Sequence, residues 1–199
     1  IIENGVDTTI FTPRTEIRKT GPLRLLCVAR LIQRKGQKTL IEALKILKKE
    51  GREATLDLVG GGDDYKRLTN FVRKCRLTEQ VQFLGAVERT DMPGCYRKAD
   101  VFVLASHNEG MSISMLEAMA ASLPVIVTKT PGVQEIVRNN QNGWIFPVGC
   151  ADQLAHILRP LCDNPESARP LGMRARSSVQ DRSWGKIADS YANLFLSVG

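Results

Sequence analysis

Residues 99–128 read ADVFVLASHNEGMSISMLEAMAASLPVIVT, and this stretch holds two strand-like runs on either side of a helical pattern. Val101–Ala105 is a short apolar run of the kind that forms a buried parallel strand. Met111–Ala121 carries apolar residues at helical spacing, and a second strand-like run, Val125–Val127, follows Pro124. The stretch therefore predicts a strand, a loop, a helix and a strand, with the loop at the carboxyl edge of a parallel sheet.

This loop should face a ligand, because a helix N-terminus offers free amide donors and a partial positive charge to an anion. Glu109 precedes the predicted helix, and Glu117 lies inside it. If both were helical, they would be separated by about 12 Å along the axis and about 80° around it. Paired glycosidase carboxyls need only about 5 to 9.5 Å. The two carboxylates therefore suit two separate hydroxyl-bearing groups with an anion between them.

Strand and helix patterns alternate along the rest of the chain. The expected strands are Leu23–Ala29, Ala54–Val59, Val81–Leu84 and Trp144–Phe146, and the expected helices include Gly36–Glu50, Asp152–Leu161, Glu166–Val179 and Ser183–Leu196. This alternation predicts an α/β fold with a Rossmann-like, doubly wound parallel sheet.

The loop after the first strand carries the cations Arg30, Arg34 and Lys35, beside a glycine that opens a helix. They offer the fixed charge and backbone amides that a diphosphate needs, although any basic surface loop would look similar. Gly60, Gly61 and Gly62 follow the second strand and predict a tight turn that lets a ligand approach the backbone. They do not form the dinucleotide fingerprint, because its last glycine would stand at Tyr65. The next helix is expected to be capped by Asp63 or Asp64.

Three segments resemble the E-x7-E region of GT-B glycosyltransferases of the GT4 family, also called glycosyl transferases group 1. They are Glu109-Gly110, Leu116–Ala120 and Pro124-Val125. The resemblance extends over nearly the whole chain, but it covers only the carboxy-terminal, nucleotide-sugar-binding half of such enzymes. It implies a hinge from an absent N-terminal acceptor domain at residues 1–22, a donor-binding domain at 23–180, and a closing helix at 181–199 that packs toward the absent domain.

The resemblance also implies the site residues. Arg30 and Lys35 match its diphosphate-binding cations, Glu109 would take hydroxyls of the transferred sugar, and these three form the catalytic set. Glu117 would hold the ribose diol, as acidic residues do in dinucleotide sites. The alternative readings are a helix-capping residue for Glu109 and a solvated helix carboxylate for Glu117. The implied donor-binding set is Gly60, Gly61, Leu84, Gly85, Gly110, Met111, Ser112 and Glu117.

Gly132 and Glu135 match a Gly-x-x-Glu loop of the same family. For Glu135, a role as a carboxylate in the first turn of a helix is at least as good an account as a ligand contact.

The implied activity is retaining sugar transfer from a nucleotide diphosphate sugar, UDP- or GDP-linked, to a glycan or a lipid-linked acceptor. No cofactor is expected, and no Asp-x-Asp occurs in the sequence, so the protein's cations rather than a metal would neutralise the diphosphate. The domain alone is expected to transfer nothing, because the acceptor residues belong to the absent half. Two alternatives stay open: a related nucleotide-sugar epimerase or phosphorylase, and a non-catalytic nucleotide-sugar-binding module.

Composition narrows the remaining classes of partner. The net charge of +7 comes without the aromatic interleaving or helix-turn-helix pattern of a nucleic-acid-binding protein. The charge does permit attraction to anionic lipid, and hence peripheral association with a membrane. Five cysteines without C-x-x-C spacing, and no apolar run of spanning length, predict a reduced cytoplasmic protein, free or at the inner membrane face.

Overall fold

The computed structural model describes residues 4–15, 21–189 and 192. Its strands are β1 (Leu23–Val28), β2 (Ala54–Val59), β3 (Val81–Gly85), β4 (Val101–Leu104), β5 (Val125–Thr128) and β6 (Trp144–Phe146). They form one sheet in the order β3-β2-β1-β4-β5-β6, and every neighbouring pair is parallel. The strand order reverses between β1 and β4, so the loops after these two strands meet at a topological switch point.

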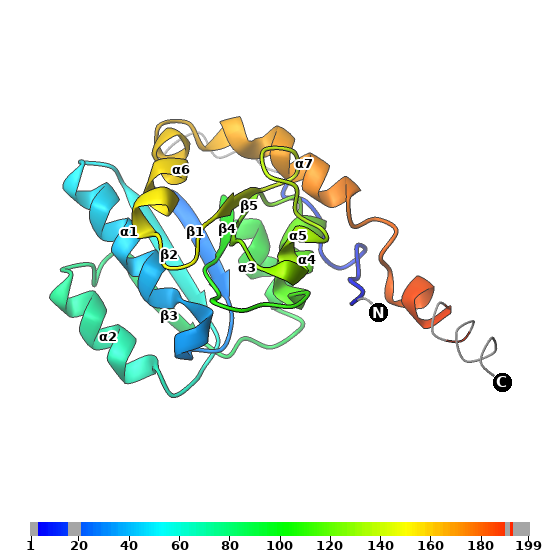
Figure 1. The fold of residues 1–199 in the computed structure, drawn as a ribbon, viewed down its shortest axis with the longest axis horizontal. Coiled ribbons are helices and arrows are strands. Elements are labelled where there is room, and N and C mark those ends of the chain that lie inside the picture. The colour runs from blue at the N-terminus through cyan, green and yellow to red at the C-terminus, as the bar shows by residue number, and fades with distance from the viewer. Residues whose placement is uncertain (1–3, 16–20, 190–191, 193–199) are drawn as a thin grey trace.

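Helices flank the sheet on both sides (Figure 1). Their bounds are η1 (Gln33–Lys35), α1 (Gln37–Lys49), α2 (Tyr65–Lys74), α3 (Met92–Lys98), α4 (Ile113–Ala120), α5 (Pro131–Gln134), α6 (Ala151–Asp163), η2 (Pro165–Ala168) and α7 (Arg169–Ser177). Helix α1 packs beside α2 and α6, whereas α4 packs against α7. The predicted doubly wound α/β fold is confirmed.

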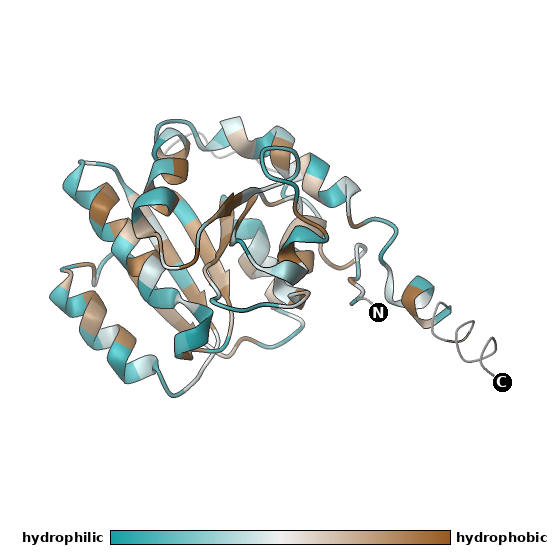
Figure 2. Cartoon of the chain, in the orientation of Figure 1, coloured by the Kyte–Doolittle hydropathy of each residue, from teal (hydrophilic) through white to brown (hydrophobic). Residues whose placement is uncertain are grey.

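The core lies around β4 and β5, where every residue is buried. Strands covered on both faces have no solvent side, so their sequences are continuous apolar runs and not alternating ones. Figure 2 shows this as hydrophobic residues along the central strands, with mixed residues on the helices around them. Helix α4 is also apolar on most sides, since it is enclosed between the sheet and α7.

Three local predictions differ from the structure. Helix α4 begins at Ile113 and not at residue 111, because Ser112 is its N-cap. Asp64 stands at the N-cap of α2, but its carboxylate binds the guanidinium of Arg67 instead of helix amides. Glu135 lies at the C-terminal end of α5, so the prediction of a first-turn carboxylate was wrong.

The two end segments of the described chain lie side by side. The backbone amide of Val6 donates to the carbonyl of Arg182 at 2.8 Å, and Gly5 lies against Trp184. Part of the predicted closing helix is present, since residues 184–189 and 192 are helical and Trp184 is 43% exposed. The other apolar residues expected on its face, Tyr191, Leu194 and Phe195, lie outside the described residues. No helix in the described ranges is both long and apolar enough to cross a bilayer.

Candidate functional site

The loops after β1 and β4 touch through their backbones at the switch point. Gly36, between η1 and α1, has a φ of +66°, and a Cβ atom there would lie 2.0 Å from the carbonyl oxygen of Ala105. The amide of His107 donates to the carbonyl of Arg34 at 2.7 Å. A glycine is required at this contact, because any side chain would separate the two loops. The contact places Lys35 beside the loop that carries Glu109.

Lys35 and Glu109 form an ion pair. Lys35 Nζ lies 2.5 Å from Glu109 Oε2, and the two side chains are 15% and 13% exposed. Ser106 Oγ donates to the same oxygen at 2.8 Å, and the carbonyl of Ser106 accepts from Thr128 Oγ1 at 2.6 Å. Groups from the ends of β1, β4 and β5 thus hold the Glu109 carboxylate. Two of the three residues predicted to be catalytic are in direct contact.

Arg30, the third of that set, is fixed through its backbone and not through its side chain. Its carbonyl accepts from Gln37 Nε2 at 2.8 Å, while the residue itself is exposed. The guanidinium has no hydrogen-bond or ion-pair partner within residues 4–15, 21–189 and 192. It is therefore available to an anion, although no contact joins it to Glu109.

The N-terminus of α4 lies next to Glu109 and carries three residues of the predicted donor-binding set. Ser112 Oγ accepts from the amide of Met115 at 3.4 Å and contacts Ser114 Oγ at 3.0 Å. Gly110 leaves open space where a Cβ would stand. The first amides of a helix have no partners within the helix, and with its dipole they favour an anion at this end.

Two neighbouring segments hold the Glu109 loop from outside. A Cβ on Gly132 in α5 would lie 2.4 Å from the carbonyl carbon of Gly110, so the two backbones are in close contact. Asn4 Nδ2 donates to the carbonyl of Met111 at 2.8 Å. The predicted hinge segment thus reaches the predicted donor loop directly.

Glu117 lies on α4 and accepts a hydrogen bond from a buried tyrosine. Tyr96 Oη is 2.7 Å from Glu117 Oε2. Burial raises the pKa of the Glu117 carboxyl, and the hydrogen bond from Tyr96 and the charge of Arg89 only partly oppose that shift. The sequence did not predict this partner. The available signal was that a buried tyrosine hydroxyl usually requires one.

The glycine-rich loop after β2 closes against the neighbouring strand ends. Gly60 has a φ of +127°, and its amide donates to the carbonyl of Gly85 at 2.7 Å. The carbonyl of Gly61 accepts from the amide of Leu31 at 2.9 Å, and its Cβ position is open. Leu84 is 42% exposed. The rest of the predicted donor-binding set therefore lies at the same carboxyl edge as Lys35.

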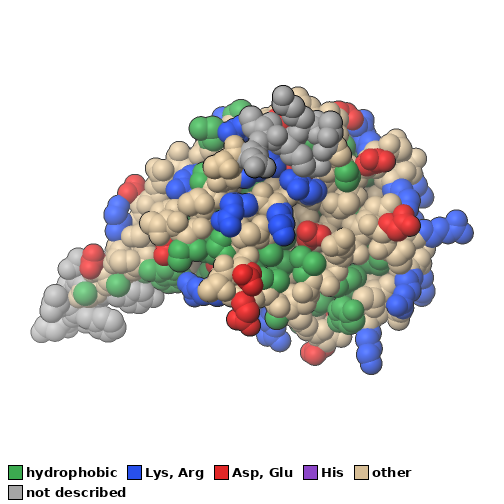
Figure 3. Space-filling model, turned by 180° about the vertical axis from the view of Figure 1, so that it is seen from behind, with side chains coloured by type: hydrophobic (Ala, Val, Ile, Leu, Met, Phe, Trp, Pro, Cys, Tyr) green, Lys and Arg blue, Asp and Glu red, His purple; other side chains and the backbone are tan. Residues whose placement is uncertain are grey.

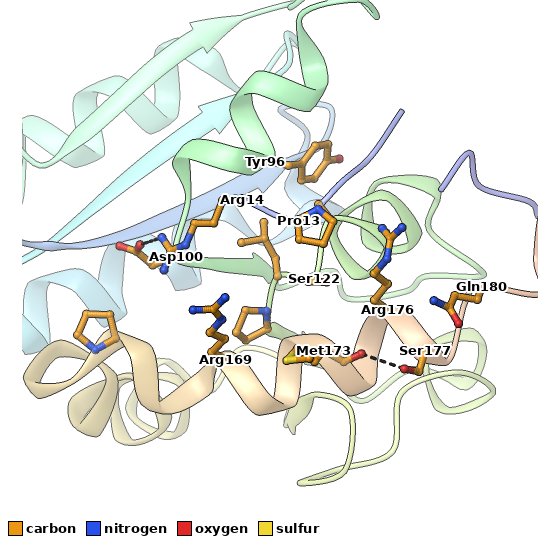
Figure 4. Close-up of a pocket in the computed structure, with 14 residues that line it drawn as sticks. Pro13, Arg14, Tyr96, Asp100, Ser122, Arg169, Met173, Arg176, Ser177 and Gln180 are labelled. Atoms are coloured by element: carbon orange, nitrogen blue, oxygen red, sulfur yellow. Dashed lines mark hydrogen bonds and ion pairs between the residues drawn. The ribbon is translucent and has the colours of Figure 1, made fainter. Parts of the chain in front are cut away.

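A separate cavity of about 290 Å³ lies at the opposite edge of the sheet, where Asp100 precedes β4 and Pro124 precedes β5 (Figure 4). Its charged groups are already paired. Arg14 Nη1 lies 2.6 Å from Asp100 Oδ1, and Arg176 donates to backbone carbonyls. We read this cavity as structural, because the predicted site residues are at the other edge.

Comparison with known proteins identifies the family. Residues 10–178 match the family described as glycosyl transferases group 1. The chain belongs to this family. The resemblance to this family, which the sequence indicated, is thereby confirmed over most of the chain.

Curated relatives in the family are glycosyltransferases. The chain is 32% identical to a GDP-mannose-dependent alpha-(1-6)-phosphatidylinositol monomannoside mannosyltransferase of Mycobacterium tuberculosis, over 96% of this chain and 54% of the relative. It is 33% identical to the amylovoran biosynthesis glycosyltransferase AmsK of Erwinia amylovora, over 88% of this chain and 45% of the relative. This family member thus spans about half the length of the curated relatives it matches.

Solved structures agree with the fold. Sucrose-phosphate synthase from Thermosynechococcus elongatus superposes with a TM-score of 0.90 at 28% identity, over 99% of this chain and 52% of that one. The C-terminal domain of a glycosyl transferase group 1 family protein from Francisella tularensis superposes with a TM-score of 0.78 at 29% identity, over 89% of this chain and 98% of that one. The architecture of this glycosyltransferase-family chain is therefore one half of a GT-B fold.

Proposed function

We propose that the chain is the donor-binding domain of a retaining glycosyltransferase that uses a nucleotide diphosphate sugar. The observation that carries the proposal is the Lys35–Glu109 ion pair at the switch point, beside the N-terminus of α4. A fixed cation, a fixed carboxylate and helix amides without partners inside the helix then lie together where ligands bind to α/β sheets. This combination suits a molecule with both a diphosphate and hydroxyl groups.

In this proposal the diphosphate binds to the first amides of α4 and to the cations of Lys35 and Arg30. When the bond from the sugar to the diphosphate oxygen breaks, these groups stabilise the negative charge on the leaving diphosphate, while the sugar acquires oxocarbenium character. Glu109 accepts hydrogen bonds from hydroxyls of the transferred sugar, and Glu117 accepts hydrogen bonds from the hydroxyls of the ribose. Leu84 and Gly85 border the nucleobase.

We propose that no metal ion takes part, since Lys35 and Arg30 supply the charge that a metal would otherwise provide. The donor is expected to be UDP- or GDP-linked. The Mycobacterium tuberculosis relative, at 32% identity, is named as GDP-mannose-dependent, which supports the second choice. Acceptor binding and transfer would need the complete protein, because the chain spans only about half the length of these relatives.

We also propose a cytoplasmic location, with membrane contact limited to the protein surface. The five cysteines are free thiols, as expected in a reducing compartment. Figure 3 shows Lys and Arg side chains spread over one face, with Asp and Glu among them. A mixed surface of this kind supports weak attraction to anionic lipid.

Calorimetry with UDP, GDP, ADP and their hexose derivatives tests the proposal. Lys35→Met and Glu117→Gln should weaken binding about tenfold or more, as expected for the loss of a charge-assisted hydrogen bond. Arg34→Met is the matched control, because it removes an exposed cation next to Lys35 and should change affinity less than twofold. A folded chain that binds none of these nucleotides, or equal affinities for the wild type and both site variants, would overturn the proposal.

A further inference from the structure

Tyr96 is a buried polar group next to the proposed ribose site. It belongs to α3, and its residue is fully buried. Its hydroxyl lies 2.7 Å from Glu117 Oε2 and 3.2 Å from the carbonyl oxygen of Ser114. A phenol has one proton to donate, and the ionised acceptor is the closer and stronger one. The hydroxyl therefore donates to the carboxylate of Glu117.

The ring of Tyr96 is fixed on both sides. Phe11 meets it edge-on, with 5.4 Å between ring centroids, and Phe102 of β4 lies at 6.2 Å. The carbonyl of Phe11 accepts from Arg176, so the hinge segment is itself anchored. Figure 4 shows the Tyr96 ring beside the cavity at the amino edge, with its hydroxyl at the far end of the ring. Rigid packing of the ring gives the hydroxyl one position.

Glu117 has the opposite character, because its side chain is only partly covered. One carboxylate oxygen, Oε2, accepts from Tyr96, whereas Oε1 has no hydrogen-bond partner within the described ranges. A glutamate on a helix surface samples several rotamers, and freezing them on binding costs free energy. A hydrogen bond from a fixed donor removes much of that cost in advance.

We propose that Tyr96 is a positioning residue that holds the Glu117 carboxylate so that its free oxygen accepts the ribose hydroxyls of the nucleotide. The inference rests on the proposed function, because it assumes that Glu117 binds ribose. It adds that ribose recognition depends on a residue of α3 that never touches the ligand.

The hydrogen bond also affects the charge of Glu117. Burial raises the pKa of this carboxyl, whereas the hydrogen bond from Tyr96 and the cation of Arg89 lower it. Loss of the hydroxyl should raise the pKa further, because the charged form loses a donor. As the pH is lowered, Glu117 becomes protonated and nucleotide affinity falls. This fall should begin at a higher pH in Tyr96→Phe than in the wild type.

The experiment compares wild type and Tyr96→Phe with UDP, GDP and ADP and with the corresponding 2′-deoxy diphosphates. The wild type should prefer the best-binding ribonucleotide over its deoxy form by about tenfold. Tyr96→Phe should reduce that preference to about twofold, leave affinity for the deoxy form nearly unchanged, and shift the pH midpoint of binding upward. Ser177→Ala, which removes a hydroxyl on α7, should keep the wild-type preference.

The outcomes separate the inference from its premise. If the wild type does not distinguish ribose from deoxyribose, the ribose role of Glu117 in the proposed function is wrong. If it does, but Tyr96→Phe has the same preference and the same pH midpoint, only the positioning role is wrong. Should Tyr96→Phe fail to fold, site-specific 3,5-difluorotyrosine at position 96 keeps the ring and donates a stronger hydrogen bond. The pH midpoint of nucleotide binding should then move downward, because the stronger hydrogen bond stabilises the charged form of Glu117. An unchanged pH midpoint would overturn the inference.

Discussion

Gly36 offers the sharpest test of how the loops at the carboxyl edge of the sheet are held together. It has a φ of +66°, and a Cβ atom there would lie 2.0 Å from the carbonyl oxygen of Ala105. Alanine at this position costs about 1 to 2 kcal/mol for the left-handed backbone. It costs about 1 to 3 kcal/mol more for overpacking against Ala105, which directly follows β4. We therefore expect Gly36→Ala to lower the free energy of unfolding by about 2 to 5 kcal/mol.

Gly51→Ala is the matched control. Gly51 has a similar φ of +73°, but a Cβ atom there meets nothing within 4 Å. The free energy of unfolding of the control should therefore fall only by the backbone term of about 1 to 2 kcal/mol. Urea unfolding followed by circular dichroism measures both variants against the wild type, provided that the m-values agree.

Gly36→Ala should also impair nucleotide binding, whereas Gly51→Ala should not. Displacing η1 from the loop after β4 moves Lys35 away from Glu109, since Gly36 follows Lys35 directly. We expect about a tenfold loss of affinity for the best-binding nucleoside diphosphate. Equal destabilisation by the two variants, or wild-type affinity in Gly36→Ala, would refute the argument that the contact with Ala105 sets the position of Lys35.

Two further predictions concern the carboxylates of Glu117 and Asp100. The raised pKa of Glu117 means that the folded protein holds this proton more tightly than the unfolded chain, so the wild type loses stability as pH rises from about 4.5 through the folded pKa. The free energy of unfolding of Glu117→Gln should therefore rise relative to that of the wild type between pH 4 and pH 7 in urea titrations. The same variant should bind nucleotide more weakly. A difference in unfolding free energy that does not change with pH would contradict this prediction. Asp100, whose side chain is 1% exposed, accepts from Arg14 and Arg24 at the opposite edge. Asp100→Ala should cost about 3 kcal/mol in thermal or urea unfolding, and affinity should stay unchanged in the folded variant; a loss of binding would link the two edges.

The sequence was sufficient for the strands and for the meeting of the two loops that carry Lys35 and Glu109. Runs such as Val101–Leu104 and Val125–Thr128 are apolar throughout because both faces of these strands are covered. Once the strand order is that of a doubly wound sheet, the loops that carry Lys35 and Glu109 must meet at the switch point. The sequence thus predicted their proximity without any side-chain detail.

Side-chain partners could not be predicted in the same way. Asp64 has the residue type and position of a helix cap, but Arg67 lies one turn away and forms the stronger, charge-assisted contact. Tyr96 looked like a core residue, and its ring is one. Its hydroxyl meets Glu117 only because the fold brings this side chain of α3 to α4, and no local pattern encodes that contact.

A crystal structure of the chain with GDP or UDP would show which residues hold the diphosphate. We expect the diphosphate within about 2.7 to 3.2 Å of Lys35 Nζ and of the first amides of α4, with a ribose hydroxyl on Glu117 Oε1. A nucleotide bound elsewhere, for example in the cavity beside Asp100, with Lys35 and Glu117 making no contact to it, would show that this edge of the sheet does not bind the donor.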